Sequence, residues 1–266
     1  MKSVSTSELC AWIDAVLNTS SFSDYCPNGL QVEGKPIVRH IVAGVTASQA
    51  LIEHAVAQGA DTLLVHHGWF WKGEDVRVRG IRRTRLKQLL EHDINLLAYH
   101  LPLDAHPLLG NNAQLARILG LVPEYTTGKD QTITTAARPI TTGPNGLVWL
   151  GTMPGLCALG QIAQRVHECL GRMPLTIGAP DLEVKRIAWC TGAAQNMLTD
   201  AIEAGVQCFI TGEISEPTVH LARESGVGFI SAGHHATERY GVQALGHAIS
   251  EKFGVQVDFI DLENPV

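Results

Sequence analysis

The sequence contains no apolar run of about 18 residues, the length that a helix needs to cross a bilayer. The first segment also lacks the long apolar core of a signal peptide, and it places Glu8 and Asp14 within a helical pattern. We therefore predict a cytoplasmic protein with a folded N-terminal helix and no membrane partner.

Motifs of several common function classes are absent as well. The six cysteines form no C-x-x-C pair, so neither a zinc knuckle nor a redox dithiol is indicated, and we expect buried thiols in a reducing compartment. No G-x-G-x-x-G or Walker A loop occurs, and Ser48 and Ser231 lack a G-x-S-x-G elbow. The formal net charge of −6 argues against a surface made as a whole for nucleic acid.

What is present fits an ordinary α/β protein. The chain has 266 residues, of which 45% are hydrophobic and 17% charged, and its length favours two domains. We place these domains at 1–125, with His66, His67 and Asp104, and 126–266, with His234 and Glu238, and interleaving of the two domains is the alternative. Strand-like apolar runs at 41–46, 62–68 and 94–100 alternate with helix-like segments, which predicts a mostly parallel or mixed sheet.

An internal repeat supports two similar α/β halves. Residues 41–68 align without gaps onto residues 187–214, an offset of 187 − 41 = 146, and Gly59 meets Gly205 at the end of the predicted helix. Identities are few, so chance similarity between two generic strand–helix–strand units is the alternative interpretation.

Histidines and acids stand where the predicted strands end. The pair His66-His67 follows one buried strand, and the next strand runs into His100 and, four residues on, an aspartate. In the second half, the corresponding strand runs into a histidine with a glutamate four residues on, a spacing that puts both on one helix face. Because ligands gather beyond the carboxyl ends of parallel strands, we expect a two-metal site. Its predicted ligands are His66, His67, Asp104, His234 and Glu238.

Three imidazoles and two carboxylates suit two ions of Zn, Fe, Mn, Co or Ni, and do not suit Ca or Mg. A single histidine at a strand end is more often a hydrogen-bonded core or surface group, whereas the combination favours a metal centre. Further side chains at the same strand ends would orient a ligand or take part in proton transfer. These candidate catalytic residues are Glu238, His100, His235 and Glu213.

Several segments of the chain resemble the motifs of the Nif-three-like family, the GTP cyclohydrolase I type 2 homologues, and in particular its bacterial YbgI-type members. The matching segments span nearly the whole chain: DYCPNGLQVEG, GVTAS, LLVHHGWFWKG, HLPLDAHPLLGNN, AWCTGAAQ, FITGEISE and GHHATER. The resemblance implies a two-domain α/β subunit with a dinuclear metal centre in the cleft between the domains. It also implies a homohexamer made of three dimers. The family's ligand positions map onto the five predicted ligands, with Glu238 able to bridge both ions.

An arginine-rich segment, 77–87, lies close in sequence to the histidine pair. Guanidinium groups match phosphate oxygens, so a phosphate-binding role is one interpretation and a solvated helix face is the other. The phosphate-binding candidates are Arg79, Arg82, Arg83 and Arg85. The aromatic run Trp69, Phe70 and Trp71 would be costly to leave in water, and we expect a subunit contact, with base stacking as the alternative.

The leading hypothesis is a dinuclear metal-dependent hydrolase, cyclohydrolase-like or phosphoesterase-like, that acts on a nucleotide or a related phosphorylated compound. The alternative is a non-catalytic, metal-binding hexameric ring that binds nucleic acid or a protein partner through residues 77–87 and the aromatic run. An open coordination position favours catalysis, and a closed one favours structure.

Overall fold

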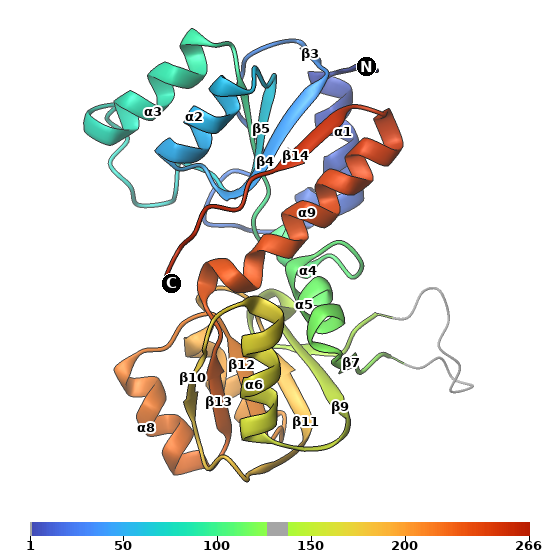
Figure 1. Cartoon of the computed structure of the whole chain (residues 1–266), viewed down its shortest axis with the longest axis vertical. Coiled ribbons are helices and arrows are strands. Elements are labelled where there is room, and N and C mark those ends of the chain that lie inside the picture. Colours follow the sequence, from blue (N-terminus) through green and yellow to red (C-terminus); the bar gives the residue numbers. More distant parts are fainter. Residues whose placement is uncertain (1, 127–137) are drawn as a thin grey trace. The chain divides into compact units, whose positions relative to one another are not determined.

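The computed structural model describes residues 2–126 and 138–266, and the chain divides into two compact units (Figure 1). The first unit comprises Met1–Gly110 and Arg239–Glu263, and the second comprises Asn111–Glu238 and Asn264–Val266. Each unit is built around its own sheet, so both are of the α/β class that the alternating pattern predicts.

The first unit contains a five-stranded sheet in the order β14-β4-β5-β6-β2. Its four neighbouring strands β14, β4, β5 and β6 are parallel, and β2 pairs antiparallel with β6 at the edge. The bounds are β14 Gln256–Phe259, β4 His40–Thr46, β5 Thr62–His67, β6 Asn95–Ala98 and β2 Gly29–Val32. A separate small sheet pairs β1 (Val4–Ser5) with β3 (Ile37–Val38).

Helices cover both faces of this sheet. On β4, Ile41 and Ala43 pack with α1 (Thr6–Leu17) and α9 (His234–Phe253), whereas Val42 packs with α2 (Gln49–Ala57) and α3 (Gly80–Glu91). Successive side chains on a strand point to opposite faces, so this alternation divides one buried strand between two cores. The sheet is therefore the middle of three layers, which is why its strands are apolar throughout.

The second unit contains a seven-stranded mixed sheet. Its path is β10-β13-β12-β11-β9-β7, with β8 also paired to β9. The strands β11, β12 and β13 are parallel, whereas β10 and β9 run antiparallel to their neighbours. The bounds are β7 Val122–Pro123, β8 Thr141–Thr142, β9 Val148–Ala158, β10 Leu175–Ile177, β11 Glu183–Trp189, β12 Cys208–Thr211 and β13 Gly228–Ser231.

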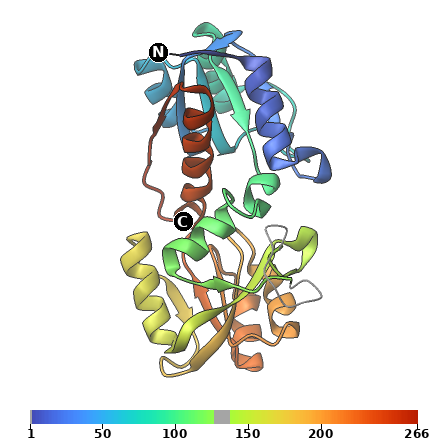
Figure 2. The ribbon, with the colours of Figure 1, turned by 90° about the vertical axis from the view of Figure 1, so that its right-hand side faces the viewer.

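Helix α6 lies on one face of this sheet, and α7 and α8 lie on the other (Figure 2). The apolar side of α6 is buried, as its spacing of Leu159, Ile162 and Val166 predicts. The remaining bounds are α4 Leu101–Ala105, α5 Asn111–Leu119, α6 Leu159–Leu170, α7 Leu198–Glu203, α8 Glu216–Ser225 and the short 3₁₀ turns η1 Thr19–Ser21, η2 Pro144–Gly146 and η3 Gln195–Met197.

The internal repeat is confirmed as a structural repeat. The pairing of β4 with β5 sets Ile41 opposite Thr62, and the pairing of β11 with β12 sets Ile187 opposite Cys208, the same register at the predicted offset. The intervening helix corresponds to η3 followed by α7, and the helices end at Gly59 and Gly205, both with left-handed φ. Each unit therefore uses the same strand–helix–strand building block.

The first crossing between the units falls at Gly110, earlier in the chain than the expected boundary near residue 125. The cause lies in the next helix, because Asn112 is fully buried within the second unit. Its side-chain amide donates to the Leu147 carbonyl at 3.1 Å and accepts from the Thr191 N–H at 3.1 Å. This asparagine therefore ties α5 to the sheet of the second unit.

The six cysteines are all free thiols, and Cys26, Cys190 and Cys208 are buried, while the others are partly exposed. Burial raises the pKa of Cys26 to about 12, so this thiol is unreactive near neutral pH. Among the helices of residues 2–126 and 138–266, none is both long and apolar enough to span a bilayer.

One buried carboxylate fixes the start of the parallel strands in the first unit. Asp61 accepts hydrogen bonds from the Lys35 ammonium at 2.8 Å and from the backbone N–H groups of Arg39 and His40 at 2.8 and 3.1 Å. Burial alone would raise the pKa of Asp61, but these donors outweigh it and lower the pKa below its usual value. The ionised form is therefore the one that the fold binds.

We predict that Asp61→Asn lowers the free energy of unfolding by about 1–3 kcal/mol at pH 7, because an amide cannot replace a carboxylate that accepts these bonds. The pKa of Asp61 is lower in the folded protein than in the unfolded chain, where it is about 3.9. The ionised carboxylate therefore stabilises the fold above the unfolded-state pKa, and this stabilisation is lost as the pH falls through the folded-state pKa. Urea unfolding should show that the difference in the free energy of unfolding between wild type and Asp61→Asn becomes smaller from pH 7 to pH 3.5. The control is Asp181→Asn, which changes an exposed aspartate. A difference that does not depend on pH would contradict this role.

Candidate metal centre

The histidine pair stands at the end of β5, as the sequence predicts. His66 is fully buried and His67 is half-buried, and their ring centroids lie 4.5 Å apart. Side chains of consecutive strand residues normally point to opposite faces of a sheet. The short distance between the two rings therefore shows that the regular strand geometry ends here and that both imidazoles come together.

A backbone hydrogen bond fixes the tautomer of His66. Its Nδ1 donates to the carbonyl oxygen of Tyr99 at 2.8 Å, because a carbonyl can only accept. The neutral ring therefore carries its lone pair on Nε2, and that atom lies 3.4 Å from Oδ1 of Asp104, which is buried in α4. Two acceptor atoms that face each other in a buried place are stabilised by a shared cation or an added proton.

His67 has a similar constraint on the side away from this pair. Its Nδ1 lies 3.1 Å from the hydroxyl oxygen of Thr46, which belongs to the neighbouring strand β4. Trp71 packs near it, with ring centroids 6.1 Å apart, and donates its indole N–H to the Gly68 carbonyl. His67 is therefore positioned by Thr46 of β4 and by Trp71 of the turn after β5.

His100 belongs to the same histidine group. Possible ligand atoms of His66, His67 and His100 all lie within 4.8 Å of one another. The Nδ1 of His100 lies 2.7 Å from Oδ1 of Asp24, which leaves Nε2 as the ring nitrogen that faces away from this acid. Sequence reasoning placed His100 as an orienting or proton-transferring residue, and the structure brings it against the predicted ligands.

Sequence reasoning missed Asp24. This carboxylate also accepts from the Asn28 amide at 2.9 Å and from the Leu101 N–H at 3.0 Å. Burial raises the pKa of Asp24, but the contact with His100 and the other donors outweigh burial and bring the pKa down to about 2. A lone aspartate in an irregular loop gave no periodic signal. Only its place in the motif DYCPNG could have pointed to it.

In the second unit, His234 and Glu238 face each other on the first turns of α9, as their spacing predicts. The Nε2 of His234 lies 3.0 Å from Oε2 of Glu238, and its Nδ1 lies 2.6 Å from Oε1 of Glu213. Burial lowers the pKa of His234, but the two carboxylates outweigh burial and raise it to about 9. The structure thus places Glu213 against the His234 ring, on the side away from Glu238's contact with Nε2.

Two glycines make room for this pair. A Cβ atom on Gly192, which has a left-handed φ of +70°, would collide with Oε1 of Glu238. A Cβ atom on Gly212 would lie 2.6 Å from the Cα atom of His234. Both glycines follow the carboxyl ends of parallel strands, so the backbone there can approach the acid and the histidine closely.

The remaining predicted residues differ in their surroundings. His235 is half-buried, and its backbone N–H donates to the Val266 carbonyl at 3.0 Å. Arg79 and Arg82 are paired with two acids that lie just before their segment, Asp75 and Glu74. The candidates Arg83 and Arg85 are respectively exposed and half-buried. Local pairing gives Arg79 and Arg82 a structural explanation that needs no phosphate.

The aromatic run is also held mainly by its own unit. Trp69 is buried in the core beside α2, and its indole N–H donates to the Ala47 carbonyl at 3.0 Å. Phe70 is exposed and has the Arg82 guanidinium 5.6 Å from its ring centroid. The expected subunit contact is therefore wrong for Trp69, because this side chain fills a core position and meets its hydrogen-bond requirement there.

The donor set fits a transition-metal ion of the Zn to Ni group. Imidazole nitrogen atoms and carboxylate oxygen atoms are the preferred ligands of these ions, and His66 and His234 each offer Nε2 while an acceptor holds Nδ1. The three-histidine group of the first unit has one fully buried member and two half-buried ones, so solvent reaches part of it.

Comparisons with known proteins agree with the resemblance seen in the sequence. The chain is 51% identical over 263 residues to a GTP cyclohydrolase 1 type 2 homolog of Pseudomonas aeruginosa, covering 98% of this chain and 99% of the relative. It is 50% identical to the Escherichia coli K12 protein of the same name, covering 97% of this chain and 98% of the relative.

Solved structures match over the same length. The structure of protein ybgI, described as of unknown function, has a TM-score of 0.89 at 48% identity and covers 99% of this chain and 100% of its own. A protein from Thermus thermophilus has a TM-score of 0.84 at 34% identity, with coverage of 99% and 100%. A family model matches residues 4–265, and the chain therefore belongs to the Duf34/NIF3 (NGG1p interacting factor 3) family.

Proposed function

We propose that the protein is a metal-dependent hydrolase that acts on a nucleotide or a related phosphorylated compound. The observation that carries the proposal is the shared arrangement of His66 and His234: each Nδ1 is held by an oxygen acceptor, and each Nε2 faces a carboxylate. Metal-binding histidines typically show this arrangement. The name of the similar bacterial proteins, GTP cyclohydrolase 1 type 2 homolog, supports a nucleotide as the class of substrate.

In this proposal the first unit supplies His66, His67 and Asp104, and the second unit supplies His234 and Glu238. The family resemblance implies that both sets serve one dinuclear centre. Divalent ions held by these donors would lower the pKa of a bound water toward neutrality and so supply a hydroxide at neutral pH. The two carboxylates offset the charge of the ions, and the imidazoles complete the coordination.

Residues behind the ligands would keep the site in one protonation state. Asp24, whose pKa is lowered to about 2, stays ionised near neutral pH and holds Nδ1 of His100, so that ring presents Nε2. Glu213 does the same for Nδ1 of His234. In this proposal His100 positions or accepts a proton next to His66 and His67, whereas Glu213 orients a ligand.

The proposal extends to assembly and location. A homohexamer made of three dimers follows from the family resemblance, and light scattering tests it. Six free thiols suit the reducing cytoplasm. A ring that only binds nucleic acid through the arginine-rich segment is the weaker proposal, since Arg79 and Arg82 are already paired with Asp75 and Glu74.

The hydrolase activity is tested by screening the metal-loaded protein against nucleotides and phosphoesters. We expect turnover that falls at least about 100-fold in Glu238→Gln and in His66→Ala, since both remove a donor from the centre that activates water. Products with an opened purine ring indicate a cyclohydrolase, and free phosphate indicates a phosphoesterase. Activity that survives both substitutions at full metal depletion would refute the hydrolase.

Metal retention is a separate prediction that needs no substrate. His66→Ala and Glu238→Gln should each retain less Zn or Mn than wild type after dialysis, as measured by plasma mass spectrometry, because each removes one donor. His220→Ala is the matched control, since His220 pairs with Glu216 on an exposed helix face at the same spacing. If the two site variants retain as much metal as this control, the ligand assignment is wrong.

The acid behind His234 gives a graded prediction. Glu213→Gln should weaken metal affinity by about 10- to 100-fold without abolishing binding, because the amide is a poorer acceptor for the ring N–H that orients the ligand. Competition with a chromogenic chelator measures the affinity. Glu216→Gln, which changes the exposed pair with His220 in the same way, should leave it unchanged. Equal affinities in the two variants would show that Glu213 does not orient the ligand.

A further inference from the structure

Arg172 lies in the loop between α6 and β10, against the residue that precedes His234. A Cβ atom on Gly233 would collide with Nη1 of Arg172 and would lie 3.0 Å from its Cζ atom. The guanidinium group therefore packs on the bare backbone of Gly233, which also has a left-handed φ of +101°. Any residue with a side chain at position 233 would clash with the guanidinium group, so Arg172 can pack here only because residue 233 is a glycine.

The topology of the sheet places Arg172 at the end of the sheet where the parallel strands of the second unit have their carboxyl termini and where the predicted donors lie. The strand β10 runs antiparallel to β13, with Leu175 opposite Ser231, so the residues before Leu175 lie where β13 ends. The strands β11, β12 and β13 are parallel, and Glu213 and His234 follow the ends of β12 and β13. Arg172 thus joins the edge at which ligands of parallel sheets collect.

The Nη1 atom of Arg172 has no acceptor within residues 2–126 and 138–266. It is buried without a hydrogen-bond partner there, although the residue as a whole is partly exposed. Glu213, the acid on this edge, lies 2.6 Å from His234 and makes no ion pair with Arg172. By contrast, Arg186 in the same unit forms two hydrogen bonds to Glu124.

A buried guanidinium N–H without an acceptor costs free energy, and an anionic oxygen group is the partner that restores it. We propose that Arg172 binds a phosphate group of the substrate beside His234. This inference rests on the proposed function and names the residue that recognises its phosphorylated substrate. The planar fork of arginine matches two phosphate oxygens. The residue as a whole is partly exposed, and in this proposal its fork turns off the Gly233 backbone so that the buried Nη1 meets the phosphate.

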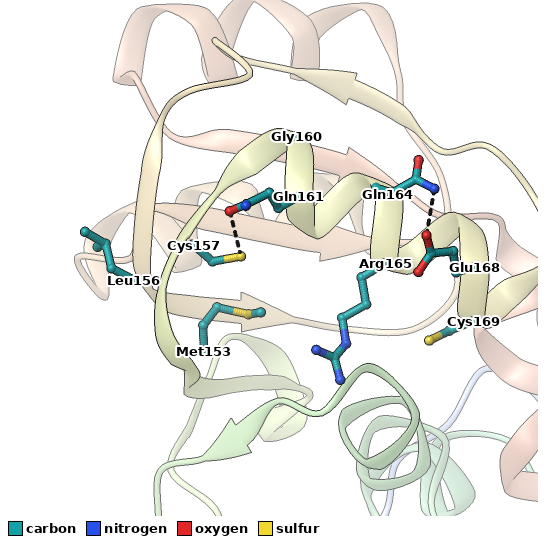
Figure 3. Close-up of a pocket in the computed structure, with 9 residues that line it drawn as sticks. All are labelled: Met153, Leu156, Cys157, Gly160, Gln161, Gln164, Arg165, Glu168 and Cys169. Atoms are coloured by element: carbon teal, nitrogen blue, oxygen red, sulfur yellow. Dashed lines mark hydrogen bonds between the residues drawn. The ribbon is translucent and has the colours of Figure 1, made fainter.

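A second arginine of the same unit provides the matched control. Arg165 lies on the exposed side of α6, in an open groove of about 710 Å³ that contains none of the predicted metal ligands (Figure 3). It packs against Gly120, as Arg172 packs against Gly233. The groove is lined, among others, by Met153, Leu156, Cys157, Gln161, Arg165 and Cys169.

The experiment is a calorimetric titration of inorganic phosphate into wild type, Arg172→Gln, Arg172→Lys and Arg165→Gln. Each protein is titrated both metal-loaded and after treatment with a chelator, and its metal content and circular dichroism are recorded. We expect Arg172→Gln to weaken phosphate binding at least about tenfold with unchanged metal content. Arg172→Lys, which keeps the charge and the fold but loses the fork, should lose less, and Arg165→Gln should bind as wild type does.

Phosphate affinity equal to wild type in both Arg172 variants would overturn the proposal. Loss of metal from a folded Arg172→Gln variant would overturn it as well, because Arg172 would then serve to position the metal donors. The failure of the proposed function has a different signature. Wild type would then retain no metal and hydrolyse nothing, while the loss of phosphate binding in Arg172→Gln would still be measured.

Discussion

Parallel strand pairing is the constraint on which both donor sets depend. Strands that run in the same direction all end at one edge of their sheet, so whatever follows each strand is brought to that edge. In the first unit this rule places the end of β5 beside the end of β6, and thus His66 beside His100. In the second it places Glu213 beside His234. The identical register of the two strand–helix–strand blocks shows that one building plan serves both units.

Hydrogen bonds to Nδ1 give these edges their chemical character. A strand end alone would leave an imidazole free to rotate and to exchange tautomers. The Tyr99 carbonyl, Asp24 and Glu213 each hold Nδ1 of one histidine, so the three rings present Nε2. Holding the ring in advance lowers the entropic cost of binding an ion and fixes which nitrogen atom does so.

Much of this arrangement could be predicted from the sequence, because it depends on short-range periodicity. Strand ends follow from apolar runs, and the facing of His234 and Glu238 follows from helical spacing. Asp24 could not be found in this way, since it meets His100 through an irregular loop and a long separation in sequence. The same holds for Arg172, whose place depends on Gly233 and on the antiparallel direction of β10.

The arginine-rich segment and the aromatic run show the opposite error. Their local patterns suggested phosphate binding and a subunit contact, whereas the structure gives several of these residues partners within their own unit. Charge density in the sequence does not reveal which charges are neutralised, and here Asp75, just before the segment, accepts from Arg79. A subunit contact was likewise expected for Trp69, which the fold buries in the core of its own unit. The two units interleave, as the alternative left open by the sequence has it, because the pairing of β14 with β4 returns the end of the chain to the first unit.

The most direct test of the account is anomalous X-ray diffraction from crystals of the protein loaded with Zn or Mn. The account predicts ions bound to Nε2 of His66 and to Nε2 of His234, with Nδ1 of each ring still bonded to Tyr99 and to Glu213. Ions bound to Nδ1 of these rings, or bound only at the cysteines, would contradict it.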